Sequence, residues 1–124
     1  MLQYLLTAII FVVLDGLYLN LIKDYFNKQI KVVQGTDIKV DMIAVGITYV
    51  FLIFGINYFI IQTNRSVKDA ALLGLVIYAV YDFTNLSLFT KWTYLTAFID
   101  TLWGAVLFGL TTAIVYKIKD VFRF

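Results

Sequence analysis

Residues 67–89 read VKDAALLGLVIYAVYDFTNLSLF, and this run sets the class of the protein. A bilayer core of about 30 Å is crossed by roughly 20 helical residues, so the run is long enough to span a membrane. Ser66 to Asp69 has the spacing of a capping box, which predicts a helix start near Val67. The run also contains Asp82, a carboxylate that is expensive to keep in lipid and therefore points to a function.

Three further apolar runs have a similar length, at residues 2–22, 42–62 and 93–116. The composition agrees, with 62% apolar residues and a mean hydropathy of +0.89. Proline is absent, so no helix is kinked by that route. We therefore predict an all-α, multi-pass integral membrane protein, a single domain over 1–124 with four transmembrane helices. The first run lacks the flanks of a signal peptide and is expected to be retained.

The segment after the first span mixes lysines with Phe26, Ile30 and Val33 at helical spacing and then reaches Gly35, a helix terminator. It predicts a short amphipathic extension of helix 1 at the headgroups. The extension either anchors the chain to anionic lipid or docks a partner. Further along the chain, Trp92 and Tyr94 are expected to be interfacial anchors.

The lysines and arginines are balanced, five on each predicted side of the membrane, so the positive-inside rule gives no orientation. Either the lysine-rich first loop sets one orientation, or the protein inserts both ways and pairs antiparallel. A net charge of +2 is too small to imply nucleic acid as a partner. The expected partners are the lipid bilayer and further copies of the chain, or another membrane assembly.

Three acids interrupt the spans at a similar depth. Asp15 lies eight residues before Lys23, Asp82 lies nine before Lys91, and Asp100 lies nine after it. At 1.5 Å per helical residue, each carboxyl group is about 12 to 14 Å below the same membrane face. We therefore predict that the three acids share one layer.

Polar and aromatic residues are expected to surround this layer. Asn85 and Tyr78 are three residues after and four before Asp82, so both share its helix face and Asn85 joins the candidate site. Trp103 either packs against its neighbouring glycine or acts as a gate. The expected supporting residues are Tyr49, Tyr78, Tyr81, Thr84 and Trp103.

Small residues recur every fourth position on the third and fourth spans, where they let helix backbones approach closely. They predict a packing seam, either within one chain or between two chains. Its main residues are Gly74, Gly104, Ala105, Gly109 and Ala113.

Cysteine and histidine are absent, which excludes thiolate and imidazole chemistry, tetrahedral zinc and histidine-ligated haem. No catalytic signature is present, and no cofactor is expected. Charged aspartates close together in a low dielectric repel, so at least one should keep its proton unless a cation binds. Their oxygens suit a proton or a hard cation, and the identity of any metal stays open.

The run from Gly74 to Asn85, read as G-x-x-x-Y-x-x-Y-D-x-T-N, and the later D-x-x-W-G from Asp100 to Gly104 closely resemble the signature of predicted membrane proteins called domain of unknown function 2177. The resemblance extends over nearly the whole chain, although Lys91-Trp92-Thr93 replaces an expected Gly-Trp-Pro. It implies a compact helical membrane protein of bacteria or some large DNA viruses, with no established activity.

Three functions fit these residues. The first is an oligomeric proton- or cation-linked transporter or channel that uses the acid layer. The second is a structural or assembly protein of a cellular or viral membrane, in which the aspartates form an interhelical hydrogen-bond network. The third is an enzyme acting on lipid, which is disfavoured because no lysine or arginine lies near the acids to clamp a phosphate.

Overall fold

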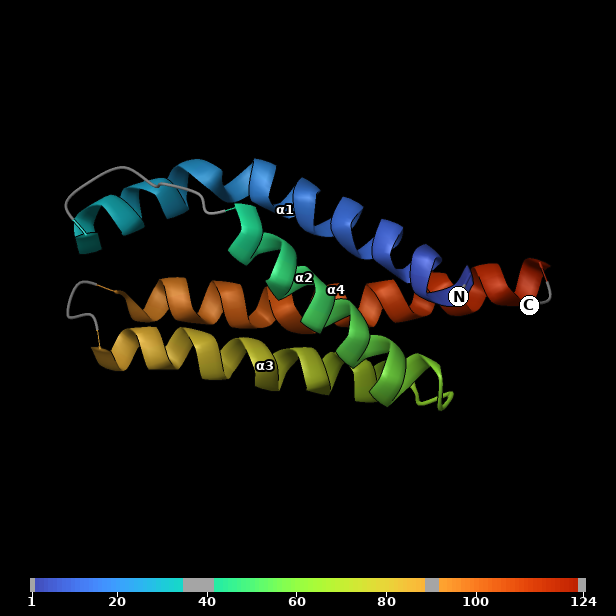
Figure 1. The fold of residues 1–124 in the computed structure, drawn as a ribbon. Helices are drawn as coiled ribbons and strands as arrows, with labels where there is room; N and C mark the ends of the chain where they lie inside the picture. Colours follow the sequence, from blue (N-terminus) through green and yellow to red (C-terminus); the bar gives the residue numbers. More distant parts are fainter. Residues whose placement is uncertain (1, 35–41, 89–91, 123–124) are drawn as a thin grey trace.

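The structure is a computed structural model that describes residues 2–34, 42–88 and 92–122, and this part of the chain is helical without strands. Each of its four long helices is apolar enough to cross a membrane, counting α2 and η1 as one span. The predicted all-α four-helix membrane protein is confirmed. The elements, drawn in Figure 1, are α1 (Leu2–Gln34), α2 (Met42–Ile56), the π-helical turn η1 (Asn57–Ile61), α3 (Val67–Leu88) and α4 (Tyr94–Phe122).

The helix α4 is the centre of the bundle. It packs against α3 along its length and against α1 on another side, while α2 crosses the bundle obliquely (Figure 1). In its most apolar window α4 has 50% of its residues buried, against 17% for α1, 17% for α2 with η1 and 11% for α3. The other three helices therefore bury few of their residues. The buried polar residues of α4 are Thr96, Asp100, Thr101, Thr111 and Thr112.

Two helices are longer than the apolar runs predicted. α1 continues without a break to Gln34, so the extension is a helical continuation of the first span. The predicted terminator Gly35 lies outside the described residues. α4 continues to Phe122, and at 1.5 Å per residue its 29 residues exceed the bilayer core. Nothing in either segment breaks a helix, because the chain has no proline.

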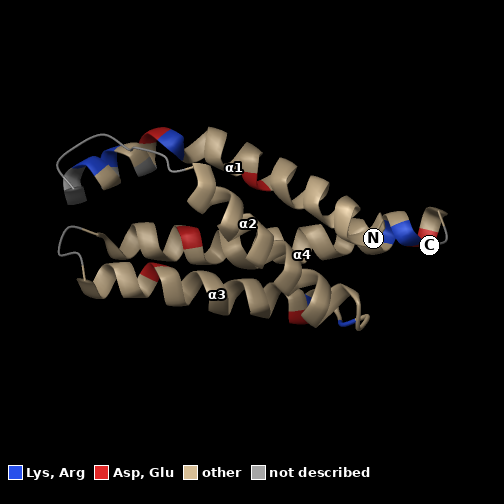
Figure 2. Ribbon diagram, viewed as in Figure 1, with Lys and Arg blue, Asp and Glu red and all other residues tan. Residues whose placement is uncertain are grey.

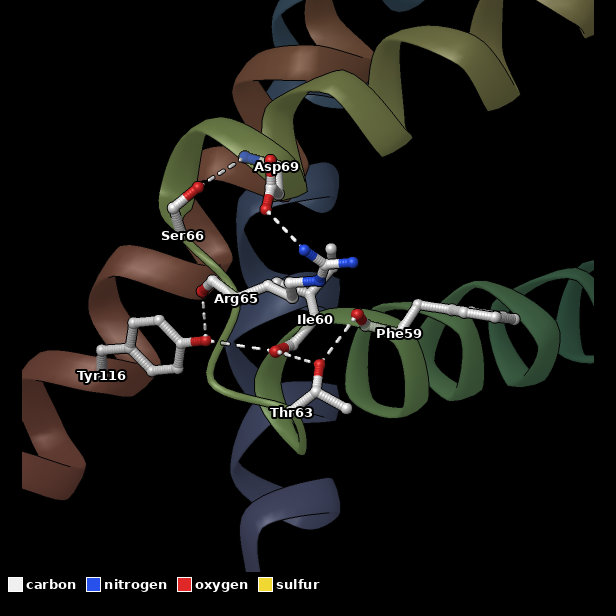
Figure 3. A network of polar contacts seen from close by, with 7 residues as sticks. All are labelled: Phe59, Ile60, Thr63, Arg65, Ser66, Asp69 and Tyr116. Atoms are coloured by element: carbon white, nitrogen blue, oxygen red, sulfur yellow. Dashed lines mark hydrogen bonds and ion pairs between the residues drawn. The ribbon is translucent and has the colours of Figure 1, made fainter.

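The turn between α2 and α3 is held by backbone and side-chain hydrogen bonds (Figure 3). The amide of Asp69 donates to the Ser66 hydroxyl at 3.0 Å, and α3 begins at Val67 as predicted. The second half of the capping box does not form as predicted, because the Asp69 carboxylate pairs with Arg65 at 3.7 Å instead. The Tyr116 hydroxyl of α4 donates to the carbonyl of Arg65 at 2.6 Å and so ties the turn to α4.

The closest packing in the bundle is between α3 and α4. A Cβ atom added to Gly74 would lie 2.2 Å from the carbonyl oxygen of Gly104 and 2.8 Å from Phe108. A Cβ atom on Gly104 would lie 2.3 Å from the ring of Tyr78. Both positions need glycine because a neighbouring helix occupies the place of a side chain. This part of the small-residue seam lies within one chain.

The rest of the predicted seam is looser. A Cβ atom on Gly109 would meet Ala71 at an ordinary contact distance of 3.5 Å. Ala105 and Ala113 are half-buried on the same helix. The tight contact is therefore limited to the stretch where Gly74 and Tyr78 face Gly104.

The charged residues gather at the two ends of the bundle, and a few acids lie within its middle (Figure 2). The two expected interfacial anchors differ. Tyr94 is 69% exposed, as an anchor at the headgroups would be, whereas Trp92 is only 6% exposed. Trp92 instead packs inside the protein near the start of α4, so its expected position was wrong. Among the described residues its indole N–H has no hydrogen-bond acceptor.

Candidate functional site

Two carboxyl groups meet between α3 and α4. Because these helices are antiparallel and Tyr78 faces Gly104, the next turn along each brings Asp82 opposite Asp100. The neighbours of the Asp82 carboxyl group are accordingly Asp100 and Thr101. Asp82 is fully buried and Asp100 is 9% exposed. No hydrogen-bond donor among the described residues serves either oxygen of Asp82.

The third acid is bound differently. Asp15 of α1 accepts hydrogen bonds on both oxygens, one from the Tyr49 hydroxyl of α2 and one, at 2.9 Å, from the Trp103 indole N–H of α4. Because Trp103 follows Asp100 by three residues, Asp15 lies about one helical turn further along α4 than Asp100. The three acids therefore differ in their surroundings. Asp82 and Asp100 face each other, whereas Asp15 lies apart from them with both oxygens hydrogen-bonded.

Tyr18 connects the Asp82–Asp100 pair to the residues around Asp15. Its hydroxyl donates to Asp100 at 3.4 Å. Its ring stacks on Trp103, with centroids 4.4 Å apart and planes 3° from parallel. Sequence reasoning did not include Tyr18 in the site. The available signal was its place three residues after Asp15, on the same helix face.

The predicted supporting residues divide into three groups. Tyr49 and Trp103 contact Asp15, as described above, and Tyr78 and Tyr81 line a cleft beside Asp100. Neither Tyr78 nor Asn85 makes the hydrogen bond to Asp82 that their spacing suggested, since both Asp82 oxygens lack a donor. Thr84 is exposed on the outer face of α3, and Asn85 is half-buried.

The cleft opens between α2 and α3 and has a volume of about 370 Å³. In Figure 1, α2 runs obliquely across α3 instead of along it. Asp100 of α4 is the acid at the cleft. Its lining residues are Thr48 and Leu52 of α2, Ile77, Tyr78 and Tyr81 of α3, and Asp100.

The chemistry of the site follows from its charges. Among the described residues no lysine or arginine interacts with Asp82 or Asp100, so the pair has no built-in counter-ion. The same residues contain no cluster of three or more acids close enough to hold a metal ion. Two facing carboxyl groups in a low dielectric cannot both be ionised without a large repulsion. The pair is therefore suited to hold a proton or a single added cation.

A second polar cluster lies toward the other end of the bundle. Asn57, in the π-helical turn η1, is fully buried, and its side-chain oxygen accepts from the Thr7 hydroxyl of α1 at 3.1 Å. Its amide nitrogen donates to the carbonyl of Ile53 at 2.9 Å. The bond with Thr7 pairs two different helices, whereas the bond to Ile53 lies within one. The cluster joins the end of α2 to α1.

The T-shaped ring pair of Phe11 and Phe108, with centroids 5.5 Å apart, lies between the two polar regions along α1 and α4. Both rings are fully buried. Because Phe11 is four residues from both Thr7 and Asp15, this pair separates the Asn57 cluster from the acids. Apolar packing therefore closes the acid site on the side that faces the Asn57 cluster.

Comparison with known proteins supplies the family. No curated protein matches the chain, and no solved structure matches it. A family described as predicted membrane protein (DUF2177) matches residues 1–117, which is nearly the whole chain. The match agrees with the four spans, and it covers the stretch that contains Asp82 and Asp100. The chain therefore belongs to the DUF2177 family of predicted membrane proteins.

Proposed function

We propose that the protein is a proton-linked membrane transporter or channel in which Asp82 and Asp100 together carry the proton. The observation that carries this proposal is the pair itself, two facing carboxyl groups inside a membrane bundle with no basic partner among the described residues. Intramembrane acids are rare because they are costly, and they commonly mark ion or proton pathways. A proton is preferred to a metal because the described acids do not cluster as metal ligands.

The two acids have different access to the surroundings. Asp100 lines the cleft, whereas Asp82 is fully buried behind it. The proton is shared between Asp100 and the buried Asp82. The Tyr18 hydroxyl, bonded to Asp100, extends the polar contact toward Asp15. The working form is proposed to be an oligomer, in which further copies cover exposed apolar faces of the bundle away from the cleft.

The test is proton flux into liposomes that contain the purified protein and carry a pH gradient. Asp82→Asn and Asp100→Asn should each abolish flux, since an amide cannot carry the proton. Asp24→Asn is the matched control, because Asp24 is an exposed acid near the end of the first span. Wild-type protein that is folded but passes no protons under a pH gradient or a membrane potential would contradict the proposal.

A structural role is the second candidate, and the hydrogen bonds of Asp15 favour it. This carboxyl group joins three helices through Tyr49 and Trp103, as an interhelical network would. Such bonds contribute on average about 0.6 kcal/mol each in lipid. If Asp82→Asn and Asp100→Asn lowered thermal stability as much as Asp15→Asn while wild type passed no protons, the scaffold function would be the better one.

A further inference from the structure

The cleft beside Asp100 has the lining of a site for an organic cation. We propose that it binds an amphipathic organic ammonium ion, with the charged nitrogen at Asp100 and the apolar part against Tyr78 and Tyr81. The volume of about 370 Å³ lies within the range of roughly 300 to 1,000 Å³ typical of small-molecule sites. A single bare inorganic ion would leave most of this space unfilled.

The walls favour a cation over a neutral or anionic ligand. Two tyrosine rings line the cleft together with one carboxyl group, and aromatic ring faces attract ammonium ions most strongly when these are desolvated. The described residues offer no lysine or arginine to the acid pair, so the cleft has negative charge to neutralise. Leu52 and Ile77 complete an apolar wall for the remainder of the ligand.

Access to the cleft is from the side of the bundle. Tyr81 is 58% exposed, and Thr48 is exposed on the facing helix. Thr48 is six residues after the start of α2, and Asp100 is six after the start of α4, so both lie about 9 Å inside the helix ends. The opening therefore faces the bilayer. Amphipathic ammonium ions partition into membranes, whereas inorganic cations do not. Entry from the bilayer therefore selects amphipathic ammonium ions.

The inference rests on the proposed function at one point, which is the competition between ligand and proton. When an ammonium ion binds at Asp100, the proton that the carboxyl pair holds is released to water, and the net charge in the cleft stays constant. One bound cation should therefore release up to one proton. The fully buried Asp82 has no donor of its own among the described residues, so it shares this exchange through Asp100.

The probe for this site is benzyltrimethylammonium, with the neutral isostere neopentylbenzene as the comparison. Binding is measured by isothermal titration calorimetry on the purified full chain in detergent. We expect one site that binds the cation at least tenfold more tightly than the isostere. Asp100→Asn should remove this preference, and proton release should be detectable in weakly buffered solution.

A pair of tyrosine variants tests the aromatic wall. Tyr81→Leu keeps an apolar side chain but removes the ring, and it should weaken cation binding about fivefold. Tyr58→Leu is the matched control, because Tyr58 is 50% exposed on η1 and does not line the cleft. Equal weakening by both variants, or equal binding of the cation and its isostere to wild type, would overturn the proposal.

The outcomes separate this inference from the proposed function. Proton flux that depends on Asp100, without any binding of the ammonium probe, would overturn the cation site and keep the proton-linked function. Specific binding that Tyr81→Leu weakens, without proton flux or proton release, would support the cation site and overturn the proton linkage.

Discussion

The α3–α4 hairpin and α2 are packed in opposite ways. In the hairpin, Gly74 and Gly104 let the backbones approach so closely that a methyl group at either position would overlap the facing helix. In α2, nothing lies within 4 Å of a Cβ atom placed on Gly46, and the first half of the helix is mostly exposed. The hairpin is therefore the closely packed support of the acid pair, whereas α2 forms a sparsely packed wall of the cleft.

Polar contacts with α1 attach α2 and the π-helical turn that follows it. Tyr49, near its middle, donates to Asp15, and Asn57, just after its end, accepts from Thr7. Both partners are on α1. The α2 helix is therefore fixed to α1 while it stays apart from α3, and this arrangement leaves the cleft open.

A substitution in the closely packed hairpin should destabilise the protein most. Gly74→Ala places a Cβ atom 2.2 Å from a backbone oxygen, which cannot rotate away, so α3 and α4 must separate. We expect a loss of about 3 kcal/mol in the free energy of unfolding. Gly46→Ala, on the loose side, should raise it by about 0.5 kcal/mol because alanine favours a helix.

Both free energies are measured by unfolding the detergent-solubilised protein with SDS and following circular dichroism. The contrast would be lost if Gly74→Ala were as stable as Gly46→Ala. That result would mean that the hairpin is not closely packed in the membrane protein itself.

An intermediate effect is expected where α2 is attached. Tyr49→Phe removes the hydroxyl that donates to Asp15 and should lower the free energy of unfolding by about 1 kcal/mol. Tyr58→Phe is the control, since this ring is half exposed and stacks on Phe54. A cysteine placed at Thr48 in the Tyr49→Phe background should also react faster with a membrane-soluble maleimide. An unchanged labelling rate would show that Tyr49 does not hold α2 in place.

The smallest effect concerns the ends of α3. Ser66→Ala removes the hydroxyl that accepts from the Asp69 amide, and it should cost about 0.5 to 1 kcal/mol. Ser87→Ala removes only a hydroxyl bonded to the Thr84 carbonyl within the same helix, and should be close to neutral. Thermal melts of both variants would check this. Equal melting temperatures would mean that the cap adds nothing to a hairpin already held by close packing.

Local patterns predicted the helices well because each pattern acts within a few residues. The apolar runs gave the spans, and Ser66 gave the start of α3. The continuation of α1 past residue 22 was expected as a helical extension. The burial of Trp92 was not predicted, because a lone tryptophan beside a lysine has the same local pattern at a lipid interface and in a protein contact.

The residues that belong to the site were easier to predict than the contacts between them. The three acids stood out because charge inside an apolar run is costly. Their partners depended on which helices are neighbours. Helical spacing placed Asn85 beside Asp82, yet the neighbour that α4 supplies is Asp100. Tyr18 belongs to the site through two contacts with the distant helix α4, its hydrogen bond to Asp100 and its stacking on Trp103.

Length, hydropathy and helix caps are local properties, and they are enough to predict a four-helix membrane protein with carboxyl groups in its spans. No local pattern indicates that Asp82 faces Asp100, that Asp15 is hydrogen-bonded separately, or that α2 leans away to leave a cleft. The physical reason is that these features depend on helix register and crossing direction, which close contacts such as that between Gly74 and Gly104 set across the bundle.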